Sequence, residues 1–267
     1  MSYLFVQLLV FGALAGFGNV VGGLLLFPSR LHTTYKRYLN YLLAVGAGFM
    51  FAVTLLEIFP RALELWSKDS AAGPERYTIP FLLVTVGYLA TQFFEHTVAP
   101  HFHLGEEVHT DTVLSVRSAY AGIAGLLIHT FFDGVSIAAA AQIDPHVGFL
   151  VFLAVFMHKL PEGFTIGSMV LASGRGFREV LIATGLIGSA TLLGVIGFYL
   201  VGARFENAVM YALPIAAGVT LYVAASDLIP EVNHHGGKRP FVSLSVFGGV
   251  GLFFLIRFLL SFFSHSH

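Results

Sequence analysis

Long apolar runs separated by short polar connections form the main pattern of this chain. Eight runs reach roughly the 20 residues that an α-helix needs to cross the hydrocarbon core of a bilayer. They cover residues 3–27, 38–60, 79–99, 118–141, 147–172, 178–202, 207–231 and 241–263. We therefore expect an all-α integral membrane protein in which residues 1–267 form a single polytopic domain, because the connections leave no room for a soluble one.

An internal repeat relates the second run to the seventh. The matching residues have identical spacing in the two runs: Gly48, Val53, Glu57 and Pro60, and Gly218, Val223, Asp227 and Pro230. An odd number of steps separates these runs, so they cross the membrane in opposite directions. The pattern predicts an inverted repeat with a 3+2+3 arrangement, in which three helices lie on each side of a central pair. Inverted repeats of this kind are common among secondary transporters.

Composition excludes several classes of protein. With 56% hydrophobic and 11% charged residues and a mean hydropathy of +0.81, the chain is too apolar for an ordinary soluble domain. A net charge of −1 without a basic cluster argues against nucleic-acid binding. The chain has no cysteine, so any metal site must use histidine nitrogen and carboxylate oxygen. The first run lacks the basic start and the cleavage site of a signal peptide, and we expect it to remain as a spanning helix.

The basic residues in the connections predict an orientation. The odd-numbered connections contain Arg30, Lys36, Arg37, Arg117, Arg175, Arg178, Lys238 and Arg239. The even-numbered connections contain only Arg61, Lys68, Arg76 and Arg204. By the positive-inside rule, both termini lie outside the cytoplasm, in a plasma membrane or a bacterial inner membrane.

The candidate chemistry lies in the central pair of runs. The pattern His-x-x-x-acid-Gly occurs twice, as His129, Asp133 and Gly134 and as His158, Glu162 and Gly163. Residues i and i+4 share one face of a helix, so each run presents an imidazole beside a carboxylate. Two such faces can bind one divalent cation, at about 2.0 to 2.2 Å from each ligand atom if the ion is zinc.

Placing ionisable groups near the middle of a membrane span costs free energy, and this cost favours a functional role for the four residues. A charged side chain at the centre of a membrane costs roughly 2.5 to 3.5 kcal/mol on insertion scales, and such residues tend to mark ion pathways. Pro161 adds to the case, because a proline inside a span frees the carbonyl one turn earlier, here that of Met157, and predicts a kink beside the ligands. The alternative is a set of inter-helix hydrogen bonds that stabilise packing by about 0.6 kcal/mol each.

Lys159, next to His158, is the only lysine within a predicted run. An ammonium group in a membrane core needs an anionic partner. In one interpretation it takes the place of a second cation beside Asp133 and Glu162. In the other, it extends to the membrane surface or pairs elsewhere.

Several further residues are candidates for the ion pathway. Glu57 and Asp227 lie three residues before a proline, near the expected ends of their runs. They would form a vestibule or release site, or else be solvated at the helix end or pair with a cation in a connection. Met50 offers a thioether to the pathway or fills the core. Glu95 and His96 end the third run and either line an exit route or are simply solvated.

The remaining histidines lie in connections and at the end of the chain. The connection 101–109 holds His101, His103, Glu106, Glu107 and His109, a composition that often binds metal weakly. His234 and His235, and His265 and His267, suggest the same weak binding. None of these segments shows a rigid ligand geometry.

At His129-Thr-Phe-Phe-Asp133-Gly134 and His158-Lys-Leu-Pro-Glu162-Gly163 the chain resembles the ZIP family of divalent-metal transporters. The fourth and fifth helices of that family carry His-Asn-x-Pro-Glu-Gly-like and His-x-x-Pro-Glu-Gly-like motifs. The resemblance extends over the eight runs, the outward termini, the histidine-bearing connection and the 3+2+3 repeat. It implies uptake of zinc or a related divalent cation into the cytoplasm, with the two histidines and two acids of the motifs as the principal site and Met50 as a weaker ligand.

The chain departs from the family at a second ion site. Some members bind an adjacent cation through an Asn after the first histidine, an acid after the second and a Glu in the sixth helix. Here the corresponding positions hold Thr130, Lys159 and, approximately, Thr191. Two hydroxyls and a cation make a poor ion site, so the sequence predicts a mononuclear transport site.

The resulting hypothesis is a carrier with alternating access and no enzymatic activity. The transported ion is its substrate and no cofactor is expected. Zinc is the leading candidate, while iron, manganese, cobalt and cadmium suit the same ligands. The expected partners are the bilayer, the ion and, optionally, a second copy of the chain. An intramembrane zinc-dependent hydrolase is the alternative, but it requires a motif such as His-Glu-x-x-His, and no His-x-x-x-His occurs within a run. A seven-helix hydrolase and a carrier of protons or organic substrates are further rivals.

Overall fold

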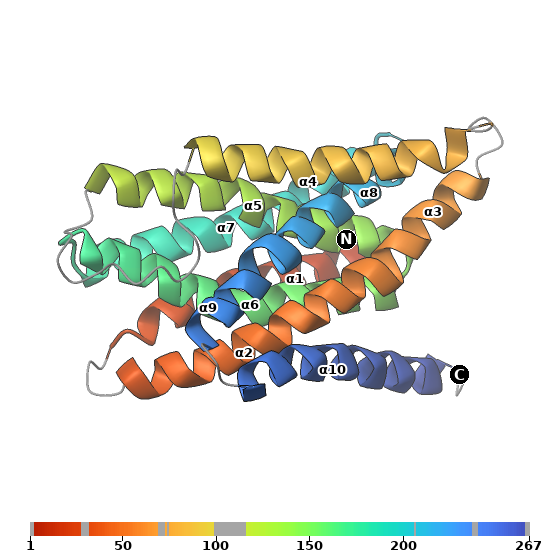
Figure 1. Ribbon diagram of the computed structural model, residues 1–267. Helices are drawn as coiled ribbons and strands as arrows, with labels where there is room; N and C mark the ends of the chain where they lie inside the picture. The colour runs from red at the N-terminus through yellow and green to blue at the C-terminus, as the bar shows by residue number, and fades with distance from the viewer. Residues whose placement is uncertain are drawn as a thin grey trace.

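Long helices that run roughly parallel or antiparallel to one another make up the structure, a computed structural model (Figure 1). It describes residues 3–27, 32–68, 73, 75–98, 116–205, 207–236 and 240–264. The α-helices are α1 (Tyr3–Leu24), α2 (His32–Val53), α3 (Phe59–Lys68), α4 (Thr78–Val98), α5 (Val116–Ile143), α6 (Pro145–Ala172), α7 (Phe177–Gly202), α8 (Ala208–Tyr222), α9 (Ile229–Gly236) and α10 (Pro240–Ser264). Two π-helical turns, η2 (Thr54–Ile58) and η4 (Val223–Leu228), join α2 to α3 and α8 to α9.

The expected number of membrane spans is confirmed. In the described ranges, eight helical segments are long and apolar enough to cross a membrane. The second segment comprises α2, η2 and α3, and the seventh comprises α8, η4 and α9. No described residue is in a β-strand. The all-α membrane fold predicted from the apolar runs is therefore correct.

The ends predicted for the second and seventh spans are wrong. Both helices continue past the proline, to Lys68 and Gly236. A proline lacks the N–H for the helical ladder, and its ring clashes with the carbonyl one turn earlier. In both spans a π-helical turn ends two residues before the proline, and this wider turn lets the helix continue. Glu57 and Asp227 therefore lie inside π-turns and not at helix ends.

The helix packing follows the inverted repeat. Helix α1 packs against α6 as α7 packs against α5, and α2 packs against α10 as α8 packs against α4. The repeat exchanges the first three spans with the last three, and α5 with α6. This exchange converts the contact of α1 with α6 into that of α7 with α5, and the contact of α2 with α10 into that of α8 with α4. The matching π-turns obey the same exchange. The predicted 3+2+3 arrangement is thus present in the packing.

The helices fall into two groups by their closest contacts. The first, here called the α5/α6 group, contains α1, α5, α6 and α7. The second, the α2/α8 group, contains α2, α3, α4, α8, α9 and α10 with the two π-turns. The main contacts between the groups are those of α6 with α2 and of α5 with α8 and α4.

The glycine that ends each central motif allows two helices to cross closely. A Cβ on Gly163 would lie inside the van der Waals distance of the carbonyl oxygen of Asn19 on α1. A Cβ on Gly134 would meet the carbonyl oxygen of Thr191 on α7 in the same way. The last position of the motif therefore places α5 and α6 tightly against their neighbours, and the acid beside each glycine is held at the crossing.

We predict that Gly163→Ala and Gly134→Ala each destabilise the folded protein by about 1 to 3 kcal/mol, because backbone atoms cannot yield to the added methyl group. Thermal unfolding in detergent would measure this loss. The control is Gly185→Ala on α7, where a Cβ meets no atom within 4 Å. If all three variants unfold at the native temperature, the close crossings do not contribute to stability.

Candidate metal centre

Four side chains from α5 and α6 meet in the interior of the helix bundle. His129 and Asp133 come from α5, and His158 and Glu162 come from α6. One ligand atom of each lies within 4.8 Å of the ligand atoms of the others. All four residues are at most 3% exposed. The structure thus brings together the four residues that both central motifs predict as ligands.

The backbone orients His158 for ligand binding. Its Nδ1 lies 3.1 Å from the carbonyl oxygen of Ala154, one helical turn earlier. A carbonyl only accepts hydrogen bonds, so Nδ1 carries a proton, and the lone pair that a metal needs can only be that of Nε2. That Nε2 is 3.4 Å from Asp133 Oδ2 and 3.8 Å from Glu162 Oε2. It forms no hydrogen bond among the described residues, which is the state a metal ligand requires.

His129 lies between the central group and a second set of acids. Its Nε2 is 3.4 Å from Asp133 Oδ2, and its Nδ1 is 3.6 Å from Glu95 Oε1 on α4. Neither ring nitrogen has a hydrogen-bond partner in the described chain. Glu95, His129 and Asp227 form a second group whose ligand atoms lie within 4.8 Å of one another. One imidazole is therefore shared by two sets of possible ligands, one on each group of helices.

Lys159 is completely buried beside the central acids. Its Nζ is 2.7 Å from Asp133 Oδ2 and also pairs with Glu162 Oε2. The hydroxyl of Thr130 donates to Glu162 Oε1 at 2.8 Å and accepts from Lys159 Nζ at 3.3 Å. The lysine thus pairs with the same acids that a cation would contact, which excludes the interpretation that it extends to the membrane surface.

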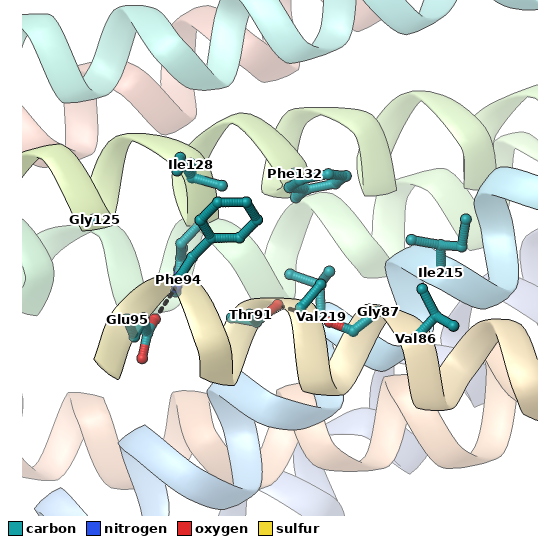
Figure 2. A pocket seen from close by; sticks show the side chains of 12 residues that line it. Val86, Gly87, Thr91, Phe94, Glu95, Gly125, Ile128, Phe132, Ile215 and Val219 are labelled. Carbon is teal, nitrogen blue, oxygen red and sulfur yellow. Dashed lines mark hydrogen bonds and ion pairs between the residues drawn. The ribbon is translucent and has the colours of Figure 1, made fainter. Parts of the chain in front are cut away.

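Two cavities reach this region. A small one of about 20 Å³ is lined by His129, His158 and Glu162, together with Pro161, Thr165, Leu43, Leu228 and Glu231. That volume suits a single water molecule or ion. A larger one of about 210 Å³ lies between α4, α5 and α8 and has largely apolar walls. Figure 2 shows Glu95 at one end of the larger cavity and Val86 and Ile215 at the other. His129 lines both cavities.

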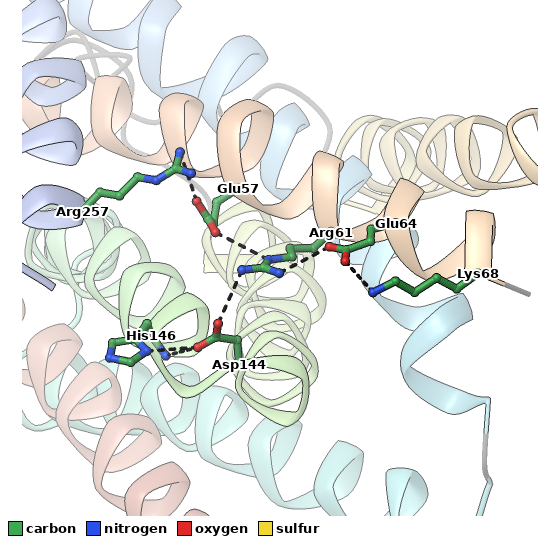
Figure 3. A network of polar contacts seen from close by, with 7 residues as sticks. All are labelled: Glu57, Arg61, Glu64, Lys68, Asp144, His146 and Arg257. Carbon is green, nitrogen blue, oxygen red and sulfur yellow. Dashed lines mark hydrogen bonds and ion pairs between the residues drawn. The ribbon is translucent and has the colours of Figure 1, made fainter. Parts of the chain in front are cut away.

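Four of the predicted pathway residues lie apart from both groups. The carboxylate of Glu57 pairs with Arg61 at 3.7 Å and with Arg257 at 3.5 Å (Figure 3). Its partners are thus cations, but they lie on α3 and α10 and not in a connection. His96 is exposed on α4, with its Nδ1 3.0 Å from the carbonyl oxygen of Gln92. Met50 is a buried core residue that lines neither cavity, although its carbonyl accepts from Thr54. Thr191 is buried where α7 crosses α5.

The connection 101–109, His265 and His267 lie outside the described residues, as does the side chain of His235. The weak metal binding predicted for them stays a prediction.

Two polar residues near the centre were missed by the sequence interpretation. Glu231 on α9 lines the small cavity. It directly follows Pro230 of the repeat, so comparison with Arg61, which directly follows Pro60, would have drawn attention to it. Asn19 is fully buried on α1 at the crossing with Gly163, and its side-chain amide has no hydrogen-bond partner among the described residues. An amide within an apolar run was the available signal, although the same run also contains Gln7.

Comparison with known proteins places this arrangement in a family. The profile of the family described as ZIP Zinc transporter matches residues 103–257, which is more than half of the chain. Zinc transporter ZIP6 of Homo sapiens is 30% identical over 153 residues, covering 55% of this chain and 20% of that protein. Zinc transporter ZIP9 of Micropogonias undulatus is 28% identical over 177 residues, covering 63% of this chain and 56% of that protein.

A bacterial relative matches over nearly its whole length. Zinc transporter ZupT of Shigella dysenteriae serotype 1 (strain Sd197) is 27% identical over 251 residues, or 90% of this chain and 94% of that protein. The aligned part is only about a fifth of the length of the ZIP6 relatives. The matched range contains both central motifs, and the resemblance inferred from them is confirmed. The chain belongs to the ZIP zinc transporter family.

Proposed function

We propose that this protein transports a divalent metal cation, with zinc as the leading candidate, across a membrane into the cytoplasm. The ion binds at a mononuclear site formed by His129, Asp133, His158 and Glu162. The observation that carries the proposal is the convergence of these four buried ligands within 4.8 Å of one another. Imidazole nitrogen and carboxylate oxygen suit zinc, iron, manganese, cobalt and cadmium alike. The names of the relatives favour zinc.

The charges of the central group favour one divalent ion over two. Asp133 and Glu162, when ionised, bring two negative charges, and the Lys159 ammonium brings one positive charge. With neutral histidines the empty site is therefore negative by one charge and attracts a cation. A first divalent ion reverses that sign, and a second would meet strong repulsion in a region of low dielectric constant. The Thr130 and Thr191 hydroxyls at the other second-site positions supply no charge to offset it.

Lys159 acts in this mechanism as a fixed cation in place of the second ion. It pairs with both acids and so offsets the cost of their burial when no metal is bound. The transported ion then enters on the imidazole side of the same carboxylates, where the Nε2 atoms of both histidines face Asp133.

The two groups of helices suggest how the site alternates between the two sides. All four central ligands belong to the α5/α6 group, whereas Glu95 and Asp227 belong to the α2/α8 group. An elevator-like or rocking displacement of one group against the other would carry the ion past these acids. His129 can pass the ion to them, because its two ring nitrogens face the two ligand sets. Glu95 and Asp227 then form the release site on the cytoplasmic side.

The orientation follows from the basic residues of the connections. With both termini outside the cytoplasm, α4 ends at the cytoplasmic side, and Glu95 and Asp227 lie on the route inward. We place the protein in a plasma membrane or a bacterial inner membrane, with residues 1–267 acting as one transport domain. A homodimer is compatible with this mechanism, since each chain contains a complete central group. The hydrolase alternative is not favoured by membership of a transporter family.

The first prediction concerns transport itself. Proteoliposomes containing the native chain should show saturable uptake of one or two ions among Zn²⁺, Fe²⁺, Mn²⁺ and Cd²⁺, measured with radiotracers. His158→Ala and Glu162→Gln should each abolish it, because the first removes a ligand and the second removes the negative charge of another. Glu179→Gln, which changes the partly exposed capping acid of α7, is the control and should transport normally. Uptake that persists in both central variants would rule out this site.

The second prediction concerns pH. Imidazole and carboxylate must be deprotonated to bind metal, so protons compete with the ion. Uptake should therefore fall as the external pH is lowered from about 8 to about 5.5, a range that brackets the ordinary histidine pKa of about 6.5. The fall should be overcome by raising the metal concentration. A flat profile over this range would contradict binding by histidine.

The third prediction concerns stoichiometry. The native chain in detergent should bind one zinc ion at the central group, counted by equilibrium dialysis and elemental analysis. Lys159→Asp should bind two, because the fixed cation is replaced by a further ligand. Two ions in the native protein, both lost in Glu162→Gln, would show that the lysine does not stand in for an ion.

A further inference from the structure

The packing fixes which residues of the two halves correspond. Gly48 on α2 lies against the carbonyl of Val246 on α10, and Gly218 on α8 lies in the same way against the carbonyl of Val84 on α4. A second pair of contacts has the same spacing and joins Gly87 to Ile215 and Gly249 to Val45. Each residue of α2 thus corresponds to the residue of α8 that is 170 positions later in the chain. Each residue of α4 corresponds to the residue of α10 that is 162 positions later.

This correspondence relates two charged clusters of opposite character. The arginine triad consists of Glu57, Arg61 and Arg257, and the acidic triad consists of Asp227, Glu231 and Glu95, written in corresponding order. The first members are both acids. At each of the other two positions, an arginine in one half corresponds to a glutamate in the other. The backbone of the two halves is therefore matched, while the charge at these positions is reversed.

In the arginine triad the carboxylate is neutralised from two sides (Figure 3). Glu57 is almost buried, and its two oxygens lie 3.7 Å from Arg61 Nε and 3.5 Å from Arg257 Nη1. Arg61 also reaches Asp144 Oδ2 at 3.5 Å. Asp144 caps the N-terminus of α6, so this ion pair joins the α2/α8 group to the α5/α6 group.

Two members of the acidic triad, Glu95 and Asp227, have a different environment from Glu57. Glu95 and Asp227 lie together with His129, and within the described residues no lysine or arginine forms an ion pair with either acid. Glu231 lines the small cavity beside the central ligands. The acidic triad therefore offers carboxylates to a cation. In the arginine triad, two guanidinium groups already take the place of that cation.

Building on the proposed function, we propose that Arg61 and Arg257 are fixed cations that close the ion pathway on their side of the protein. They occupy the position at Glu57 that corresponds to the position of a divalent ion in the acidic triad. A divalent ion cannot bind Glu57 while both guanidinium groups contact it, because their positive charges repel the ion. Arg61 must also separate from Asp144 before the two groups of helices can part on this side. The conformation described here is thus closed at the arginine triad, and the two arginines determine on which side an ion can bind outside the central group.

The test restores the symmetry of charge and counts bound ions. Arg61→Glu combined with Arg257→Glu makes the arginine triad as acidic as its counterpart, and His158→Ala is included to remove the central site. Equilibrium dialysis of the detergent-solubilised chain against Cd²⁺ should give one ion more than His158→Ala alone. Lys68→Glu combined with Arg175→Glu in the same background gives the same change of charge at exposed positions and should add no ion.

A folded double variant that gains no ion, or a control that gains as much, would overturn the proposal. Retention on size exclusion and native helix content report folding, and if the double variant does not fold, Arg257→Glu alone provides the count. Uptake gives a second measurement, since Arg61→Gln should reach half-saturation at a several-fold lower external zinc concentration than the native chain, whereas Arg61→Lys should not.

Unchanged half-saturation in Arg61→Gln would also count against the fixed-cation role. Ion counting does not require transport. If no variant and no native chain transports metal, the proposed function fails, while the extra ion still supports the role of the arginines.

Discussion

The cost of placing charge in the centre of an apolar bundle constrains the rest of this structure. Five ionisable side chains meet where α5 and α6 pack together, and none of them reaches solvent to any extent. Each must find compensation within the protein, because an unpaired ion in such surroundings costs several kcal/mol. Lys159 supplies that compensation to Asp133 and Glu162, while the nitrogens of the two histidines that face Asp133 have no hydrogen-bond partner in the described chain. With ionised acids and neutral histidines the group would keep one net negative charge, and our proposal assigns to that charge the attraction of a cation.

The helix crossings hold this balance in place. Gly163 and Gly134 let α6 and α5 press against α1 and α7, and each glycine directly follows an acid of the site. The same four helices form one group, so the ligands can move together as a rigid unit. The surrounding helices contribute Glu95 and Asp227 from across the boundary between the groups. Their two halves share a backbone arrangement but differ in charge, so the two faces of the protein are not equivalent for a cation.

Much of this could be predicted from the sequence, because the decisive signals were local or strictly repeated. Eight apolar runs correspond to the spans, and the spacing of i and i+4 brought histidine and acid to one face in both central helices. The ends of the second and seventh spans, predicted at residues 60 and 231, were placed too early, since a π-turn depends on packing that single residues do not reveal. Arg61 and Glu162, the partners of Glu57 and Lys159 on the same helical segments, were within local reach, but the other partners were not. Arg257 comes from the far end of the chain, and the pairing of Lys159 with Asp133 requires two helices to be placed together.

Anomalous diffraction from crystals grown with zinc, recorded on both sides of the zinc absorption edge, tests the central claim most directly. We predict a single strong peak at ligand distance from the histidine nitrogens and carboxylate oxygens of His129, Asp133, His158 and Glu162, with the Lys159 ammonium still beside the acids and no second peak on its side. A strong peak elsewhere, with the central group unoccupied at saturating zinc, would contradict this account.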